Sequence, residues 1–160
     1  MDQEAAETVN SLLSGIRPYL VLSALCAALF LPGLTTVPPI DRDEARFMQA
    51  TKQMLETGDV VNIRFQSVPR TKKPVGIHWL QYLSVKYGAL GDTHAVWAYR
   101  IPSVLAAWLS VICIFVFGRI LFDAKTGLIA AALSTCTIIL AVEAHLAKTD
   151  AAMLLTVIIS

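Results

Sequence analysis

The chain has 160 residues, of which 56% are hydrophobic and only 16% are charged, and its mean hydropathy is +0.61. A soluble domain carries about 25% charged residues, so the composition excludes this class and predicts a membrane protein. The formal net charge of +1 indicates no particular partner. Cys26, Cys113 and Cys136 lie in apolar intervals, where we expect buried side chains rather than disulfides or metal ligands.

The first residues, 1–16, are polar and carry Asp2, Glu4 and Glu7 ahead of Arg17. A cleaved secretory signal begins with positive charge, so we expect a short leader on the membrane surface followed by a retained anchor. Four uncharged intervals follow, and the first three approach the ~20 residues that cross a bilayer. They predict membrane spans at about 18–37, 100–121, 127–144 and from 151 onward, with a large loop at about 38–99.

The fourth uncharged interval reaches only ten residues at Ser160, which is too short to span a bilayer. We therefore expect residues 1–160 to be the N-terminal part of a larger transmembrane domain. The short connection that holds Arg119 and Lys125 suggests the orientation, because short loops rich in Lys and Arg face the cytoplasm. This rule places the loop at 38–99 on the periplasmic side.

Within this loop, residues 42–57 have the period of an amphipathic helix, and Gly58 is typical of the position just past a helix C-terminus. Asp43 and Glu44 fall on the apolar face of this predicted helix, and Arg42 falls toward the polar face. The apolar face consists of Phe47, Ala50, Thr51, Met54 and Leu55. The helix is predicted to lie against the membrane or against the spans.

A second helix is predicted from Pro74, which suits a first helical position, through the segment PVGIHWLQYLSVKYGAL. A strand is the alternative, because Val75, Ile77 and Trp79 alternate with other residues. The aromatic residues of this region fit the belt expected at the level of the lipid headgroups. They are Trp79, Tyr82, Tyr87 and Trp97.

The acidic start of the first loop helix has two interpretations. Asp41, with Glu44 three residues later, fits a capping box, which satisfies free backbone N–H groups at a helix N-terminus. Capping does not explain Asp43, and an ionisable group held near lipid is a functional candidate. Asp43 is therefore a candidate general base, and a purely architectural cluster is the alternative.

Two further polar groups flank the apolar segments. Lys72 and Lys73 precede Pro74, where backbone N–H groups at a helix start also favour an anion such as phosphate; a solvated turn is the alternative. Between the third and fourth predicted spans, the segment EAHLAKTDAA holds His145 and Asp150. On the topology above, all these clusters lie on one face of the membrane.

No spacing of His, Cys, Asp and Glu in the sequence fits a zinc site, and we interpret His78 as an interfacial aromatic residue. The loop carries more Lys and Arg than Asp and Glu. This surplus is consistent with an anionic partner, and equally with a surface that faces lipid headgroups.

The segments DRDEARF, ATKQMLETGD and RTKKPVGIHWLQY together resemble the N-terminal region of bacterial membrane glycosyltransferases of the GT-C class. This class is related to the protein O-mannosyltransferases and to the lipid A aminoarabinose transferases. The resemblance implies an all-α integral membrane fold, a multi-span helical bundle with amphipathic juxtamembrane helices in the first periplasmic loop. It also implies an enzyme of the bacterial inner membrane.

Such an enzyme transfers a sugar from a polyprenyl-phosphate carrier to a periplasmic acceptor, which is lipid A, a protein or another glycan. The resemblance assigns catalysis to Asp43 with its neighbour Glu44, and binding of the carrier phosphate to Lys73 and Arg46. It places Asp150 in the second loop, where His145 would support the site. Membrane lipids are the other expected partners, and no nucleic acid is expected.

The sequence departs from the aminoarabinose enzymes at Lys72, where those enzymes carry an acid before the Lys-Pro pair. This departure argues against a metal contact by that residue and against aminoarabinose as the sugar. No cofactor is assigned, and a divalent metal stays an open alternative that the sequence does not indicate. The alternative function is a non-catalytic membrane accessory protein or an inactive truncated product. On either hypothesis, the 160 residues alone are expected to be inactive.

Overall fold

The computed structural model describes residue 13 and residues 15–70 and 73–160. Most of the predicted leader at 1–16, and Lys72, lie outside the described residues. The described residues form seven α-helices, one π-helical segment and one short hairpin. These elements are α2 (Arg17–Phe30), α3 (Arg42–Thr57), β1 (Arg64–Phe65), β2 (Val68–Pro69), α4 (Gly76–Leu83), η1 (Ser84–Gly88), α5 (Val96–Leu121), α6 (Ala124–Thr135), α7 (Ile138–Ala144) and α8 (Asp150–Ile159).

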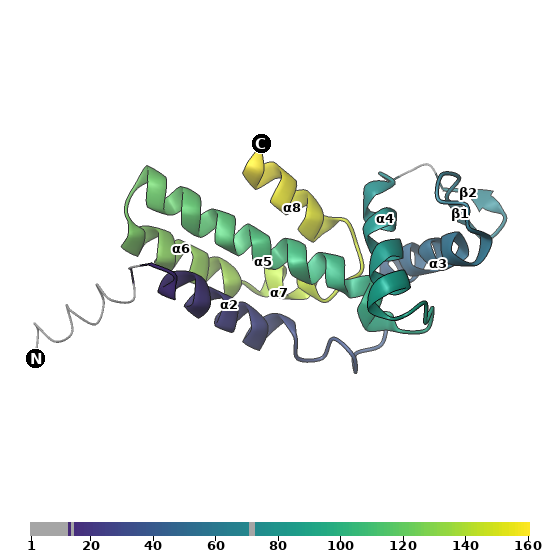
Figure 1. Cartoon of the computed structure of the whole chain (residues 1–160), viewed down its shortest axis with the longest axis horizontal. Helices are drawn as coiled ribbons and strands as arrows, with labels where there is room; N and C mark the ends of the chain where they lie inside the picture. Colours follow the sequence, from purple (N-terminus) through teal and green to yellow (C-terminus); the bar gives the residue numbers. More distant parts are fainter. Residues whose placement is uncertain (1–12, 14, 71–72) are drawn as a thin grey trace, which may run out of the picture.

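The helices form two parts, as Figure 1 shows: α2 and α5–α8 make an elongated bundle, and α3, α4, η1 and the hairpin form a smaller unit at one end. Helix α5 runs along the bundle and packs against α6, α7 and α8. The bundle interior is apolar, and Tyr19 of α2 meets Phe115 of α5 edge to face with ring centroids 5.1 Å apart. The smaller unit contacts α5 through α4 and η1.

Helix α5 covers the predicted span at 100–121 and begins four residues before it, at Val96. Its 26 residues make it the one helix among the described residues that is long and apolar enough to cross a membrane unaided. At 1.5 Å per residue the helix is about 39 Å long, which exceeds the ~30 Å hydrocarbon core. Large apolar side chains on its surface, such as Leu109 and Phe117, are exposed in this chain.

The other predicted spans differ from the observed helices. Helix α2 ends at Phe30, because Pro32 and Gly33 follow and Gly33 takes a φ of +84°. The predicted span at 127–144 is divided into α6 and α7, which bend by 63° between them. Helix α8 begins at Asp150, one residue before the expected start. Helices α2 and α8 are apolar but short, so a multi-span topology stays a prediction.

The predicted helix at 42–57 is confirmed at both ends. The Asp41 carboxylate accepts a hydrogen bond of 2.9 Å from the backbone N–H of Asp43 and so caps the N-terminus. At the other end Gly58 adopts a φ of +73°, which an L side chain disfavours, and donates to the Met54 carbonyl. Four residues of the predicted apolar face, Phe47, Ala50, Thr51 and Met54, are buried, and Leu55 is half-buried.

The second loop helix is also confirmed, and the strand alternative is wrong. Helix α4 begins at Gly76, so Pro74 lies two residues ahead of the helix rather than in its first position. The intervening residues form a small antiparallel hairpin in which Arg64 pairs with Pro69. The indole N–H of Trp79 donates to the Val60 carbonyl at 2.8 Å, which ties α4 to the segment before the hairpin.

Candidate active site

Asp43 lies in the first turn of α3 with its side chain 51% exposed. The expectation that placed it on the apolar face is wrong, because it is Glu44 that turns inward and Asp43 that faces out. Asp43 Oδ1 accepts a hydrogen bond of 3.2 Å from the guanidinium of Arg46, one helical turn later. The two residues thus form a carboxylate–guanidinium pair that is open to solvent.

Glu44 forms a fully buried ion pair with Arg100, the fifth residue of α5. The Arg100 Nε–H donates to Glu44 Oε1 at 2.8 Å, and Nη2 donates to Oε2 at 3.3 Å. This two-pronged geometry is the strongest that a guanidinium and a carboxylate make. Because both groups are removed from water, the pair fixes the start of α3 against the start of α5.

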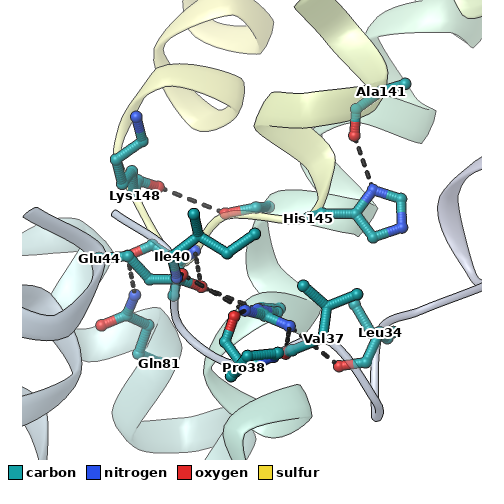
Figure 2. Close-up of polar contacts among 12 residues, drawn as sticks. Leu34, Val37, Pro38, Ile40, Glu44, Gln81, Ala141, His145 and Lys148 are labelled. Atoms are coloured by element: carbon teal, nitrogen blue, oxygen red, sulfur yellow. Dashed lines mark hydrogen bonds and ion pairs between the residues drawn. The ribbon is translucent and has the colours of Figure 1, made fainter. Parts of the chain in front are cut away.

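The remaining hydrogen-bonding atoms of the pair bind backbone from two further segments, as Figure 2 shows around Glu44. Glu44 accepts from the backbone N–H groups of Ile40 at 3.3 Å and Ala147 at 3.2 Å. Arg100 donates to three carbonyls in the segment that follows α2. These carbonyls belong to Leu34 (3.2 Å), Val37 (2.7 Å) and Pro38 (3.2 Å). One buried pair thereby joins four segments.

Sequence reasoning missed Arg100, which it treated only as the boundary of a span. A signal was present, because an arginine at the start of an otherwise uncharged interval needs a carboxylate or carbonyl partner. It also described Glu44 as a capping residue, and Glu44 does reach the backbone N–H of Ile40. A local sequence pattern does not reveal the ion pair of Glu44 with Arg100, because the two residues lie 56 positions apart.

Lys148 joins the second-loop cluster to the start of α3. Its ammonium group lies 2.9 Å from Asp41, 3.5 Å from Glu143 and 3.7 Å from Asp150. Burial acts to lower the pKa of Lys148, but the three carboxylates outweigh burial and raise the pKa above its ordinary value. Lys148 thus brings Asp41 and Asp150 together through a cation that stays charged.

Among the described residues, the hydrogen bonds of the His145 ring go to backbone carbonyls. Its Nδ1 lies 2.7 Å from the Ala141 carbonyl and its Nε2 lies 2.8 Å from the Pro32 carbonyl. Figure 2 shows the first of these contacts on the yellow-green helix. His145 thus connects the end of α7 with the segment after α2, which is a structural contact near the predicted second-loop site.

A buried polar chain links α3, α4 and the second loop. The Thr51 hydroxyl donates to Gln81 Oε1 at 2.8 Å and contacts His78 Nδ1 at 2.9 Å, and Gln81 Nε2 donates to the Ala147 carbonyl at 3.0 Å. Burial lowers the pKa of His78 to about 4, and nearby Arg70 adds to this effect. His78 is therefore neutral at physiological pH, and it is core rather than interfacial.

Lys73 lies outside the Asp43 cluster. No hydrogen bond or ion pair among the described residues joins it to Asp43. It lines a separate cavity of about 360 Å³ beside the hairpin, together with Arg64 and Arg70. Asp43 thus pairs with Arg46, and Lys148 joins Asp41 to Asp150. Lys73 lies at a separate site.

Comparison with known proteins places these features in context. Residues 72–160 match the family model described as dolichyl-phosphate-mannose-protein mannosyltransferase. Two curated relatives from Pseudomonas fluorescens are similar to the chain, namely undecaprenyl phosphate-alpha-4-amino-4-deoxy-L-arabinose arabinosyl transferases 1 and 2. The first is 28% identical over 109 residues, which cover 68% of this chain and 19% of the relative.

The second relative is 29% identical over 128 residues, which cover 80% of this chain and 21% of the relative. The chain therefore spans about a fifth of the length of the curated relatives it matches. No solved structure matches the chain at a comparable level of significance.

Proposed function

Because the chain belongs to the dolichyl-phosphate-mannose-protein mannosyltransferase family, we propose that it is the N-terminal part of a polyprenyl-phosphate-sugar-dependent glycosyltransferase. The enzyme lies in the bacterial inner membrane and crosses it several times. It transfers the sugar to an acceptor on the periplasmic face, which is lipid A, a protein or another glycan. The names of the curated relatives, which include an undecaprenyl phosphate-linked sugar, support this class of donor.

The observation that carries the proposal is the exposed Asp43 carboxylate in the first turn of α3. The buried Glu44–Arg100 pair holds this end of the helix rigidly in place. Transfer to a hydroxyl requires a base that takes the acceptor proton as the new sugar–oxygen bond forms. Asp43 is the proposed base. When the acceptor is an ionised phosphate, Asp43 instead positions the acceptor and balances the positive charge that develops on the sugar.

The carrier phosphate leaves with the electron pair of the broken sugar–oxygen bond, so it needs positive charge on its side of the site. Arg46, which already contacts Asp43, and Lys73 are the proposed phosphate-binding residues. The contacts of Glu44 favour a positioning role beside Asp43. Asp150, with its side chain 51% exposed next to Lys148, supports the second-loop side of the site.

The first test replaces Asp43 with Asn in the complete reading frame. Loss of the base should reduce sugar transfer by about 100-fold or more, in line with the usual contribution of general base catalysis. Transfer would be measured with a radiolabelled polyprenyl-phosphate sugar and membrane acceptors. Asp92→Asn is the matched control, because Asp92 lies in the same loop and its carboxylate accepts only from the backbone N–H of His94 among the described contacts.

Undiminished transfer by Asp43→Asn would refute the catalytic assignment. A wild-type protein that transfers no sugar at all, and whose membranes keep unchanged glycans and lipid A when the gene is removed, would instead favour the non-catalytic accessory protein.

The second test addresses the donor side with Lys73→Ala. We expect a higher KM for the lipid-linked donor, by about tenfold, because a charge-assisted contact to phosphate is removed. The acceptor KM should stay constant. An unchanged donor KM would show that Lys73 does not bind the carrier phosphate.

A further inference from the structure

The cavity beside the hairpin is strongly cationic. Arg64, Arg70 and Lys73 line it, and no carboxylate of the described residues does. The other lining residues are Val61, Asn62, Ile63, Pro69 and Val75. Its volume of about 360 Å³ lies within the range of small-molecule sites, about 300–1,000 Å³. Three cations around one concavity repel each other unless an anion enters.

Arg70 is held in place by an aromatic ring rather than by an acid. Its guanidinium lies 4.8 Å from the centroid of the Phe47 ring, and His78 stacks on Phe47 with centroids 5.1 Å apart. Phe47 is buried on the apolar face of α3, one turn after Asp43. A guanidinium that stacks on a ring keeps its in-plane N–H donors available.

The Nε atom of Arg70 is buried and has no hydrogen-bond partner among the described residues. A buried donor left without a partner costs free energy, so an acceptor that enters the cavity would relieve this cost. The guanidinium fork matches the oxygen spacing of a phosphate. Arg70 is therefore the residue of the cavity best prepared to hold one.

Asp59, which precedes the hairpin, does not cancel these charges. The Asp59 carboxylate accepts from the backbone N–H groups of Val61 and Asn62 and from the Asn62 side chain, at 2.9–3.0 Å. These hydrogen bonds lower the pKa of Asp59, and Arg64 makes the smallest contribution among the causes. Asp59 thus shapes the turn and makes no ion pair with Arg64 within 4 Å.

We propose that this cavity binds the phosphate of a lipid-linked headgroup, with Arg70 as its anchor and Arg64 and Lys73 as flanking contacts. The inference rests on the proposed function for the role of Lys73, and it adds Arg64 of β1 and Arg70, which directly follows β2. It makes the Arg70–Phe47 stack a direct link between α3, which carries Asp43, and the phosphate.

The test measures binding to the full chain in dodecyl maltoside, a detergent without phosphate. Undecaprenyl phosphate, phosphatidylglycerol and inorganic phosphate are titrated separately, and dissociation constants are measured by thermophoresis. Arg70→Gln is expected to weaken undecaprenyl phosphate binding by about tenfold or more, and Arg64→Gln by less. Arg70→Lys keeps the charge without the planar fork, so it should recover part of the loss.

Lys52→Gln is the matched control, because Lys52 belongs to α3 but lies outside this cavity and makes only a long ion pair of 3.8 Å with Glu56. It should bind like the wild type. Equal losses for Arg70→Gln and Lys52→Gln would overturn the proposal. Circular dichroism checks that each variant keeps its helices, and Arg70→Lys remains informative if Arg70→Gln fails to fold.

The three ligands identify the source of the phosphate. A site for the carrier binds undecaprenyl phosphate more tightly than phosphatidylglycerol, and inorganic phosphate displaces it weakly. Equal binding of the two lipids, with the same loss in Arg70→Gln, would still support the cavity and assign it to the bulk membrane. If Lys73→Gln alone abolished binding, the cavity proposal would fail while the proposed function stood. Intact binding without sugar transfer in the complete enzyme would refute the function alone.

Discussion

A buried ion pair, such as that of Arg100 with Glu44, affects the free energy of unfolding mainly when one partner is removed. Replacing Arg100 with Met leaves the Glu44 carboxylate buried beside two backbone N–H donors but without a countercharge. We expect this variant to lose about 3–5 kcal/mol of unfolding free energy. Urea unfolding in detergent, followed by circular dichroism, measures the loss.

The double variant Glu44→Met with Arg100→Met is the control. Because it removes both charges, it should be more stable than the single Arg100→Met variant. A single variant that loses less than about 1 kcal/mol would indicate that the pair is hydrated and contradict the buried geometry.

His78 predicts a pH dependence of stability. Its pKa is about 4 in the folded state and about 6.5 in an unfolded chain, so the unfolded state binds the proton more readily. The contribution to stability is complete above pH 6.5 and is lost as the pH falls toward 4, by up to about 3 kcal/mol. Melting temperatures between pH 7 and pH 4 test this expectation.

His78→Gln should flatten this pH dependence, although it lowers stability at neutral pH. The control is His94→Gln, because His94 is exposed and should leave the slope unchanged. A slope that survives in His78→Gln would assign the titration to another group.

At the scale of helices, α5 and α6 approach so closely that only glycine fits. A Cβ added to Gly118 would lie 2.7 Å from the Cα of Gly127, and one added to Gly127 would lie 2.7 Å from the backbone N of Arg119. Small residues allow such contacts between membrane helices. Gly127→Ala should therefore push the helices apart and cost about 1–3 kcal/mol.

Thermal unfolding in detergent measures this effect. Gly76→Ala is the matched control, since its added Cβ would meet no atom within 4 Å, and it should be neutral or slightly stabilising. Equal melting temperatures for the two variants would contradict the close crossing of α5 and α6.

The sequence predicted individual elements well where the signal was local. The cap at Asp41 and the left-handed residue at Gly58 mark the two ends of α3 as expected, because each acts through its nearest neighbours. The break between α6 and α7 was missed: residues 135–138 are uncharged and contain no Pro or Gly, so hydropathy alone reads them as one span. Hydropathy reports length and burial and says little about bends.

At the scale of the whole molecule, we predict the topology of the chain in the membrane. If α5 crosses the membrane, the loop at 38–99 and the connection around Asp123 lie on opposite sides. Alkaline phosphatase fused after Val61 should be active, because the enzyme folds only in the periplasm, and a fusion after Asp123 should be inactive. The reversed pattern would place Asp43 in the cytoplasm and contradict the proposed function.

The candidate site could be predicted only in part. Asp43, Arg46 and Lys148 were visible as charges at the edges of apolar intervals. The inward turn of Glu44 and its pairing with Arg100 were not, because a helical period assigns Asp43 and Glu44 to the same face and only tertiary packing separates them. The Arg70–Phe47 stack was missed for the same reason, since it joins residues 23 positions apart.

The Glu44 carboxylate is synthesised well before the groups that bind it in the folded chain. Arg100 is made 56 residues later and the Ala147 N–H 103 residues later, which at about 5–20 residues per second separates the partners by seconds. The acid therefore leaves the ribosome unpaired, and α3 can settle in its final position only when α5 and the residues after α7 have been synthesised. Completion of the bundle thus governs when Asp43 first acquires its final surroundings.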